Sequence, residues 1–157
     1  MTIRLATLSD LDGINSLLYQ VAMVHHNGRP DLFRAGCKKY TDEELEVHIE
    51  TEQDTRPIFV YEEDGAVLGY AFCMLIDYAG EHVLSPIKSL YIDDLCVDAD
   101  CRGMHIGSAL FDHVKAYAKE IGCYNVTLNV WACNPGAMKF YEKCGMQIQK
   151  MGMETVL

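Results

Sequence analysis

The sequence predicts one α/β domain in which helices cover a mixed, mostly antiparallel β-sheet. Three observations support this fold class. Helical and extended patterns of apolar residues alternate along the chain, one strong helical pattern lies between two extended ones, and no linker or repeat interrupts the 157 residues. A chain of this length that is 50% hydrophobic can bury one substantial core. We therefore expect a single domain over residues 1–157.

The N-terminal segment predicts a short strand and two helices. Residues 2–7 alternate as a strand does, and Ser9 offers an N-cap for a helix that reaches about residue 24. In that helix, apolar residues recur three and four positions apart. Thr41 then begins a capping-box pattern, which predicts a second, strongly acidic helix that reaches roughly Glu52.

The middle of the chain predicts three strands. Residues 57–61 and 66–77 are rich in β-branched and aromatic residues, and the dipeptide Asp64-Gly65 between them is a hairpin turn signal. These two strands should therefore pair antiparallel. Residues 87–97 form a third extended run.

The last third of the chain predicts a parallel pair of strands. Residues 106–121 carry the clearest helical pattern, and Gly122 ends it. Because residues 124–130 return as a strand, the strand, helix and strand form a right-handed crossover with parallel strands. Residues 134–144 predict another helix, and residues 146–156 a closing strand.

Composition and charge exclude several classes of function. The net charge of −10 argues against nucleic acid as a partner, because phosphates require a basic surface. The N-terminus does not resemble a signal peptide, and the apolar stretches are too short to span a membrane. The seven cysteines form no CxxC pair and no zinc-site spacing. We therefore expect a cytoplasmic protein with reduced thiols, without a metal ion or a membrane partner.

A glycine-containing loop lies between the third predicted strand of the middle segment and the helix that follows. It reads Arg102-Gly103-Met104-His105-Ile106-Gly107-Ser108. Amides in the first turn of a helix lack internal partners, and together with the helix dipole they can bind a pyrophosphate. Gly103 and Gly107 let the backbone approach a ligand closely, and Arg102 supplies positive charge. An ordinary loop before a helix has the same features, so both interpretations stay open on this evidence.

Residues 95–110 and 134–146 resemble two motifs of the GNAT superfamily of acetyl-CoA-dependent N-acetyltransferases. The first family pattern is Arg or Gln, two variable residues, Gly, one variable residue, then Gly or Ala. Arg102 and Gly107 match its two ends, whereas His105 stands at its first glycine. The second segment has the family's Asn, Ala, Phe-Tyr and terminal Gly at the family's spacing. With the N-terminal strand and helix, the resemblance covers nearly the whole chain.

The resemblance implies a GNAT-like domain, with a twisted sheet whose parallel pair splays apart and about four flanking helices. It also implies acetyl-CoA as co-substrate, whose pantetheine arm pairs with the strand before the loop, and a homodimer. The implied cofactor-binding residues are Leu95, Cys96, Val97, Arg102, Gly103, Met104, His105, Ile106, Gly107, Ser108, Asn134 and Tyr141. The alternative for residues 95–97 is an ordinary continuous sheet, and for Asn134 a helix cap alone.

For catalysis, the resemblance implies direct attack of a primary amine on the thioester. Tyr141 occupies the family position that protonates the departing thiolate, although its helical spacing also suits a core aromatic residue. A base must remove the amine's proton, and Asp93 or Asp94 can act directly or through water. We favour Asp93, because adjacent strand residues face opposite ways, while a local bulge would reverse this choice. Either carboxylate needs a raised pKa for this role, and both can instead be structural.

The acceptor is left open among polyamines, peptide amines, amino sugars and other small amines. The acidic charge favours a cationic acceptor, but the same field stabilises the protonated, unreactive ammonium form. A non-catalytic CoA-binding or protein-interaction module on the same fold is the alternative function. A dinucleotide site is a further alternative, but the glycine loop comes late in the chain and lacks the GxGxxG form.

Overall fold

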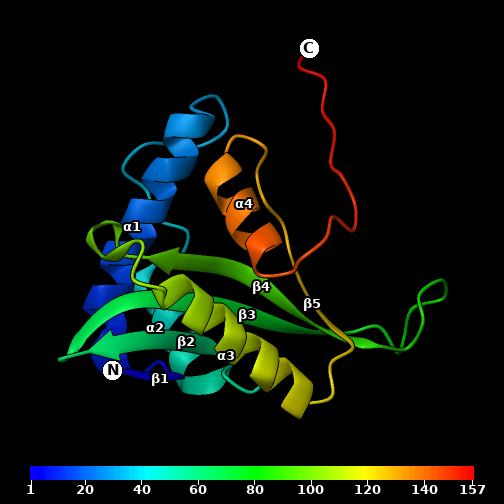
Figure 1. Cartoon of the computed structure of the whole chain (residues 1–157), viewed down its shortest axis with the longest axis horizontal. Helices are drawn as coiled ribbons and strands as arrows, with labels where there is room; N and C mark the ends of the chain where they lie inside the picture. The colour runs from blue at the N-terminus through cyan, green and yellow to red at the C-terminus, as the bar shows by residue number, and fades with distance from the viewer.

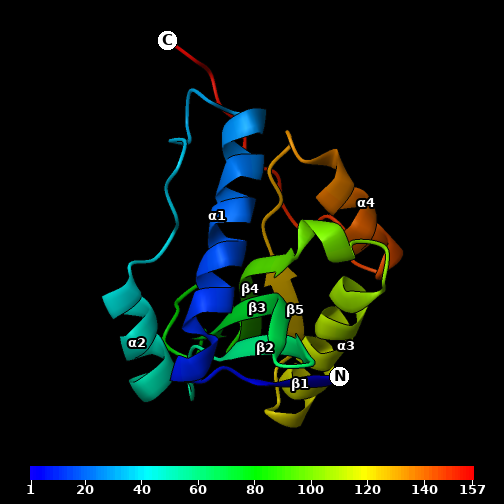
Figure 2. The same cartoon turned by 90° about the vertical axis from the view of Figure 1, so that its left-hand side faces the viewer.

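The computed structural model describes all 157 residues and forms a five-stranded sheet with helices on both faces (Figures 1 and 2). The strands are β1 (Thr2–Leu5), β2 (Ile58–Glu63), β3 (Ala66–Asp77), β4 (Lys88–Val97) and β5 (Asn125–Leu128). The helices are α1 (Leu11–Gly28), α2 (Asp42–Thr51), α3 (Ile106–Glu120) and α4 (Pro135–Lys143), with 3-10 turns η1 (Leu8–Asp10) and η2 (Ala99–Cys101).

The strands lie in the sheet in chain order, and each pair of neighbours is antiparallel except β4 and β5, which are parallel. Figure 2 shows α1 and α2 on one face of the sheet and α3 and α4 on the other. This arrangement confirms the predicted mixed, mostly antiparallel sheet with one parallel pair and four helices. None of the helices combines the length and the apolar composition needed to cross a membrane.

Two apolar cores lie on the two faces of the sheet. The alternation of side chains in β2 shows the principle, since Ile58 and Val60 pack toward α1 and α2, whereas Phe59 and Tyr61 pack toward α3. The central strands β2, β3 and β4 contribute to both cores. This two-sided burial explains why residues 57–61 read as a nearly continuous apolar run.

The first helix begins differently from the prediction. Ser9 is not its N-cap, because the chain first makes the 3-10 turn η1, with Thr7 as the capping residue. The Thr7 amide donates to Asp10 Oδ2 at 2.7 Å, and the Thr7 hydroxyl donates to the same oxygen at 3.0 Å. Asp10 then occupies the N-cap position of α1, which extends to Gly28 and not to residue 24.

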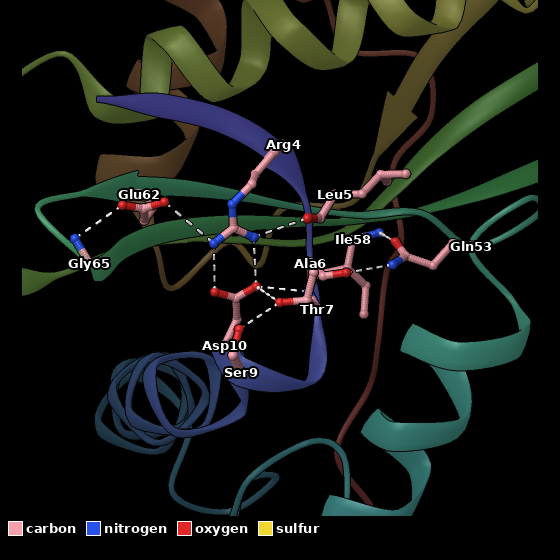
Figure 3. Close-up of polar contacts among 10 residues, drawn as sticks. All are labelled: Arg4, Leu5, Ala6, Thr7, Ser9, Asp10, Gln53, Ile58, Glu62 and Gly65. Atoms are coloured by element: carbon pink, nitrogen blue, oxygen red, sulfur yellow. Dashed lines mark hydrogen bonds and ion pairs between the residues drawn. The ribbon is translucent and has the colours of Figure 1, made fainter.

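A partly buried ion pair joins β1 to the start of α1 (Figure 3). Arg4 donates to both oxygens of Asp10, with distances of 2.7 Å from Nη1 to Oδ2 and 2.9 Å from Nη2 to Oδ1. Asp10 is only 5% exposed, and the Arg4 guanidinium holds the pKa of its carboxyl below the ordinary value of 3.8. The side chain of Gln53 similarly joins β1 to β2, because it donates to the Ala6 carbonyl and accepts from the Ile58 amide.

Residues 146–156 do not form the predicted closing strand. The Met146 amide donates to the Tyr141 carbonyl at the end of α4, and no backbone hydrogen bond follows it. Residues 147–157 are all exposed, and Figure 1 shows this segment leaving the sheet past α4. A strand requires a neighbouring edge for its backbone groups, and none lies beside this segment. Its one ion pair joins Glu154 to Arg29.

We predict that Asp10→Asn lowers the free energy of unfolding by about 2 kcal/mol at neutral pH, because Arg4 loses a charged, nearly buried partner. Since the folded pKa of Asp10 is depressed, its stabilisation is present above about pH 3.8 and is lost as the pH falls through the folded value. The difference between wild type and variant should therefore shrink on acidification. Urea unfolding at a series of pH values measures it.

The exposed Asp12 makes no side-chain bond and provides the matched control. Asp12→Asn should change the free energy of unfolding by less than about 0.5 kcal/mol. An Asp10→Asn variant as stable as this control would show that the ion pair with Arg4 does not stabilise the fold.

Candidate active site

The loop between β4 and α3 presents backbone N–H groups that have no partner in the protein. The amides of Gly103, His105, Ile106, Gly107 and Ser108 donate to no acceptor. The last three begin α3, where no preceding helical turn supplies a carbonyl. Because the positive end of the helix dipole lies at the same place, this group of amides suits an anion such as a pyrophosphate.

The side chains of the loop leave this backbone accessible. Arg102, Met104 and His105 are all exposed, and the Arg102 guanidinium makes no ion pair. Only the Met104 amide is engaged, in a long 3.4 Å contact with the Cys101 carbonyl. His105, at the position of the family's first glycine, has φ 61°, so it adopts the left-handed conformation that glycine usually supplies. The β-carbon of His105 thus does not prevent the left-handed conformation that a glycine would adopt at this position.

One side chain from α1 holds the start of this loop. Gln20 donates from Nε2 to Asp98 Oδ2 at 3.0 Å and accepts from the Ala99 amide at 3.0 Å. Asp98 in turn accepts from the Asp100 amide and caps η2. Gln20 was not predicted from the sequence, because a single amide side chain on a helix belongs to no motif.

β4 and β5 separate before the loop begins. Their parallel pairing runs from Ser89 with Asn125 to Ile92 with Leu128, whereas β4 stays paired with β3 as far as Val97. Residues 95–97 therefore lack a strand neighbour on the β5 side, which excludes the alternative of a continuous sheet there. The predicted strand over residues 124–130 is correspondingly shorter, and the unpaired edge of β4 has backbone groups available to a ligand.

A β-bulge places Asp93 and Asp94 on the same face of the sheet. Phe72 pairs with Asp94 and the next residue of β3, Cys73, pairs with Ile92, so Asp93 is the extra residue. The hydroxyl of Tyr40 donates to Asp93 and that of Tyr70 to Asp94, and both tyrosines belong to the core below α1 and α2. The expectation that only one of these carboxylates faces this side is wrong, because the bulge interrupts the alternation.

The two carboxylates differ in their surroundings. Asp93 accepts from the Tyr40 hydroxyl and pairs with Lys39 at 2.8 Å, so both of its oxygens are engaged. Asp94 accepts one side-chain hydrogen bond, from Tyr70 Oη to Oδ2 at 2.9 Å. Burial raises the pKa of Asp94 to about 6, against the lowering influence of Tyr70 and Lys39. Asp94 therefore combines an available oxygen with a raised pKa.

Tyr141 lies in α4, on the α3 face of the sheet, opposite the face on which Tyr40 and Tyr70 lie. Its ring packs against Phe140 and Phe111, with centroids 5.0 and 6.0 Å away, so the core interpretation holds for the ring. Its hydroxyl, however, has no hydrogen-bond partner in the protein. Burial, followed by the negative charge of Asp94, raises the pKa of Tyr141 well above its usual range. The Tyr141 hydroxyl is therefore protonated at neutral pH and feels the charge of Asp94.

α4 is fixed at its start by Asn134, whose side chain accepts from the Ala137 amide at 3.1 Å. This bond confirms the predicted cap. Close packing holds the helix against the loop, since a β-carbon on Gly107 would lie 3.2 Å from the Phe140 ring. The helix that carries Tyr141 thus packs directly on the first turn of α3.

The sequence model of the acetyltransferase (GNAT) family matches residues 24–146. The chain belongs to this family. An uncharacterized N-acetyltransferase of Methanocaldococcus jannaschii is 30% identical over 146 residues, which are 93% of this chain and 60% of that protein.

Solved structures share the whole fold. A variant of the BH1408 protein from Bacillus halodurans has a TM-score of 0.93 at 30% identity, over the full length of both chains. Glucosamine-6-phosphate N-acetyltransferase from Arabidopsis thaliana has a TM-score of 0.73 at 27% identity, over 99% of this chain and 97% of that one. In sequence, the plant enzyme is 35% identical over 66 residues, so the chain spans only 42% of the length of that relative.

We predict that Arg102→Ala weakens acetyl-CoA binding about tenfold, because a charge-assisted contact to phosphate contributes about 1.5 kcal/mol or more. His105→Gly should keep the affinity within about twofold, since that position contributes its amide and its left-handed backbone. Calorimetric titration with acetyl-CoA measures both effects. The exposed Lys119, at the far end of α3, supplies a charge-matched control in Lys119→Ala. Equal losses from Arg102→Ala and Lys119→Ala would remove Arg102 from the binding site.

Proposed function

We propose that residues 1–157 form one N-acetyltransferase domain, which transfers an acetyl group from acetyl-CoA to a primary amine by direct attack on the thioester. The observation that carries this proposal is the row of unpartnered amides at the start of α3, beside the unpaired edge of β4. Backbone donors of this kind suit the pyrophosphate, and the strand edge suits the amide groups of the pantetheine arm.

In this proposal the implied residues hold acetyl-CoA in three ways. The edge of Leu95, Cys96 and Val97 pairs with the arm. The unpartnered amides between Gly103 and Ser108 bind the pyrophosphate, with Arg102 beside them. Asn134 caps the helix that brings Tyr141 to the thioester. Acetyl-CoA supplies the reactive carbonyl and the thiolate leaving group.

We assign the role of base to Asp94, although the sequence favoured Asp93. An amine nucleophile must give up a proton, and the raised pKa of Asp94, about 6, lowers the free-energy cost of accepting it by about 3 kcal/mol relative to an ordinary carboxylate. At neutral pH the group is still mainly ionised. Asp93 accepts from Tyr40 on one oxygen and pairs with Lys39 through the other, so we assign it the role of orienting the loop between α1 and α2.

Tyr141 donates a proton to the departing sulfur in this scheme. As the new C–N bond forms and the C–S bond breaks, Asp94 accepts the proton from nitrogen and Tyr141 supplies one to the thiolate. Both residues border the open edge of β4 and influence each other electrostatically. The proton held by Asp94 then returns to the Tyr141 oxygen through water, so the net products are the acetylated amine and free CoA.

We propose a phosphorylated amino sugar as the first acceptor to test, because relatives with that activity match the chain in sequence and structure. The loop between α1 and α2, which contacts Asp93, supports an anionic group on the acceptor. It contains four of the thirteen basic residues of an acidic chain, namely Arg29, Arg34, Lys38 and Lys39. Arg34 alone among them makes no ion pair. This local charge argues against a purely cationic acceptor such as a polyamine.

A thiol-release assay over a panel of amines tests the function. The panel contains glucosamine 6-phosphate, glucosamine, spermidine and a lysine peptide, after calorimetry has shown acetyl-CoA binding. Asp94→Asn should lower kcat at least about a hundredfold, and Tyr141→Phe should lower kcat far more than acetyl-CoA affinity. Asp93→Asn, the matched control, should retain a larger share of kcat than Asp94→Asn.

Each outcome of this assay decides a separate point. Unchanged turnover in Tyr141→Phe would remove Tyr141 from the mechanism. If Asp93→Asn lost more activity than Asp94→Asn, the assignment of the base would return to Asp93. Binding of acetyl-CoA with no transfer to any amine would favour the non-catalytic CoA-binding module.

We propose the cytoplasm as the site of this activity. All seven cysteines are unpaired in the structure, which agrees with a reducing compartment. The charge of −10 likewise gives no basic surface for nucleic acid. Acetyl-CoA and an amine are therefore the partners that we propose besides a second copy of the chain.

We also propose a homodimer in which residues 147–157 pack on the second copy. Five large apolar side chains of this segment are at least 61% exposed, namely Ile148, Met151, Met153, Val156 and Leu157. β5 has a strand neighbour on one side only. Residues 147–157 have no strand partner, and the outer edge of β5 has no neighbouring strand. In a dimer, this segment of one copy can pack beside that edge of the other.

Sedimentation tests this assembly. The 17.7 kDa chain should sediment as a dimer, and Ile148→Asp should shift it toward the monomer, because the variant places a charge in an apolar contact. Gln149→Asp adds the same charge at the neighbouring polar position and should preserve the dimer. A monomeric wild-type protein at micromolar concentration would refute the proposal.

A further inference from the structure

Tyr70 is a buried tyrosine of β3 whose single polar atom is directed at Asp94. Its side chain is 0% exposed, and it lies opposite Cys96 in the antiparallel pairing of β3 with β4. The ring packs edge-on against Phe72 at 4.9 Å. A strand residue enclosed in this way has little freedom to move, so its hydroxyl has a fixed position.

The hydroxyl of Tyr70 makes one hydrogen bond, to Asp94 Oδ2 at 2.9 Å. An ionised carboxylate has no hydrogen to give, so Tyr70 is the donor. A buried tyrosine hydroxyl is costly to leave unpaired, which favours this bond in the folded protein. The bond engages one oxygen of Asp94 and leaves Oδ1 without a side-chain partner.

The neighbouring carboxylate shows a contrasting arrangement. Asp93 also accepts from a tyrosine, Tyr40, whose ring stacks on Phe72 at 5.3 Å. Tyr40, however, comes from the loop between α1 and α2, and Lys39 engages the second oxygen of Asp93. Two tyrosines thus pack against one phenylalanine and donate to two adjacent carboxylates, of which only Asp94 keeps an oxygen without a side-chain partner.

We propose that Tyr70 is a positioning residue for acetyl transfer, whose hydroxyl fixes the Asp94 carboxylate so that Oδ1 stays available to accept the proton of the amine. This inference rests on the proposed role of Asp94 as base. Asp94 adjoins the bulge, where the regular alternation of β4 is lost. The hydrogen bond from Tyr70, on the regular strand β3, therefore orients the Asp94 carboxylate, which the bulged backbone of β4 alone does not fix.

The same bond sets the charge state of Asp94. Burial favours the neutral acid, whereas the Tyr70 hydroxyl and Lys39 favour the carboxylate, and the nearby charge of Asp93 opposes it. The other titratable groups near this region are Tyr40, Cys96 and Tyr141 and, beside Asp93, His48 and Arg56. Burial keeps Tyr40, Cys96 and Tyr141 neutral near pH 6 and lowers the pKa of His48. The Leu95 amide, which also favours the Asp94 carboxylate, belongs to the backbone, so the Tyr70 bond is the contact that a conservative substitution can remove.

A carboxyl NMR titration tests the linkage without any acceptor. In the full-length protein labelled with ¹³C at the aspartate carboxyl carbons, the Asp94 signal is assigned by its absence in Asp94→Asn. Tyr70→Phe should raise the midpoint of the Asp94 titration by about one pH unit, because it removes a donor to the charged form. Tyr40→Phe, the matched control, should leave that midpoint within about 0.3 unit. An unchanged midpoint in Tyr70→Phe would overturn the proposal.

A second measurement uses the unaltered protein, so it does not depend on the folding of Tyr70→Phe. With ¹³C at the tyrosine ζ carbon, the Tyr70 signal should shift as Asp94 titrates, since its acceptor changes from carboxylate to acid. The Tyr40 signal should not follow the same midpoint. A Tyr70 signal that is constant between pH 4 and 8 would contradict the linkage.

Turnover then separates positioning from structure. With an acceptor from the panel above, Tyr70→Phe should lower kcat about tenfold at pH 6.5 and about threefold at pH 8.5, since only the ionisation deficit recovers at higher pH. The KM for acetyl-CoA should stay unchanged. A loss that is equal at both pH values would indicate a purely structural role. A shifted Asp94 midpoint in a protein that acetylates no amine would support the linkage and refute the proposed function.

Discussion

β4 pairs with β3 along its length but with β5 only as far as Ile92, and the candidate site depends on this asymmetry. Beyond that point one edge of β4 has unpaired backbone groups, which a ligand can satisfy. The bulge at Asp93 falls where β4 loses its second neighbour, so only one strand constrains it. The loop that follows adds unpartnered amides. One change in strand pairing thus places an edge, two carboxylates and a loop with unpartnered amides together.

The elements that the sequence predicted correctly have local signals. Thr41 and Glu44 form the expected capping box, and Asn134 caps α4. Gly122 and Gly145 have φ of 76° and 89°, where glycine is favoured at the end of a helix. The family motif likewise located the loop at the start of α3, because a short contiguous pattern fixes its backbone. Such features depend on a few residues, which are all visible in one segment.

The features that the sequence missed depend on distant segments. No local pattern marks the bulge that turns Asp93 and Asp94 to one face, because it is defined by the register between β3 and β4. Thr7 takes the place of Ser9 as the capping residue, and Asp10, which it contacts, also forms the ion pair with Arg4. A closing strand requires a neighbour as well as a suitable sequence. The partner of Asp94 is a strand residue with no motif of its own.

The bridge from Gln20 to the segment around Asp98 has a consequence for how the two substrates communicate. α1 packs against the core on the face where Asp93 and Asp94 lie. Its Gln20 side chain also forms hydrogen bonds with Asp98 and Ala99, which precede the loop of residues 102–108. Any displacement of this helix by an acceptor changes the energy of the loop, and the loop exerts an equal influence on the helix. Under the proposed function this bridge would link occupancy at one site to affinity at the other, and would favour one order of substrate addition.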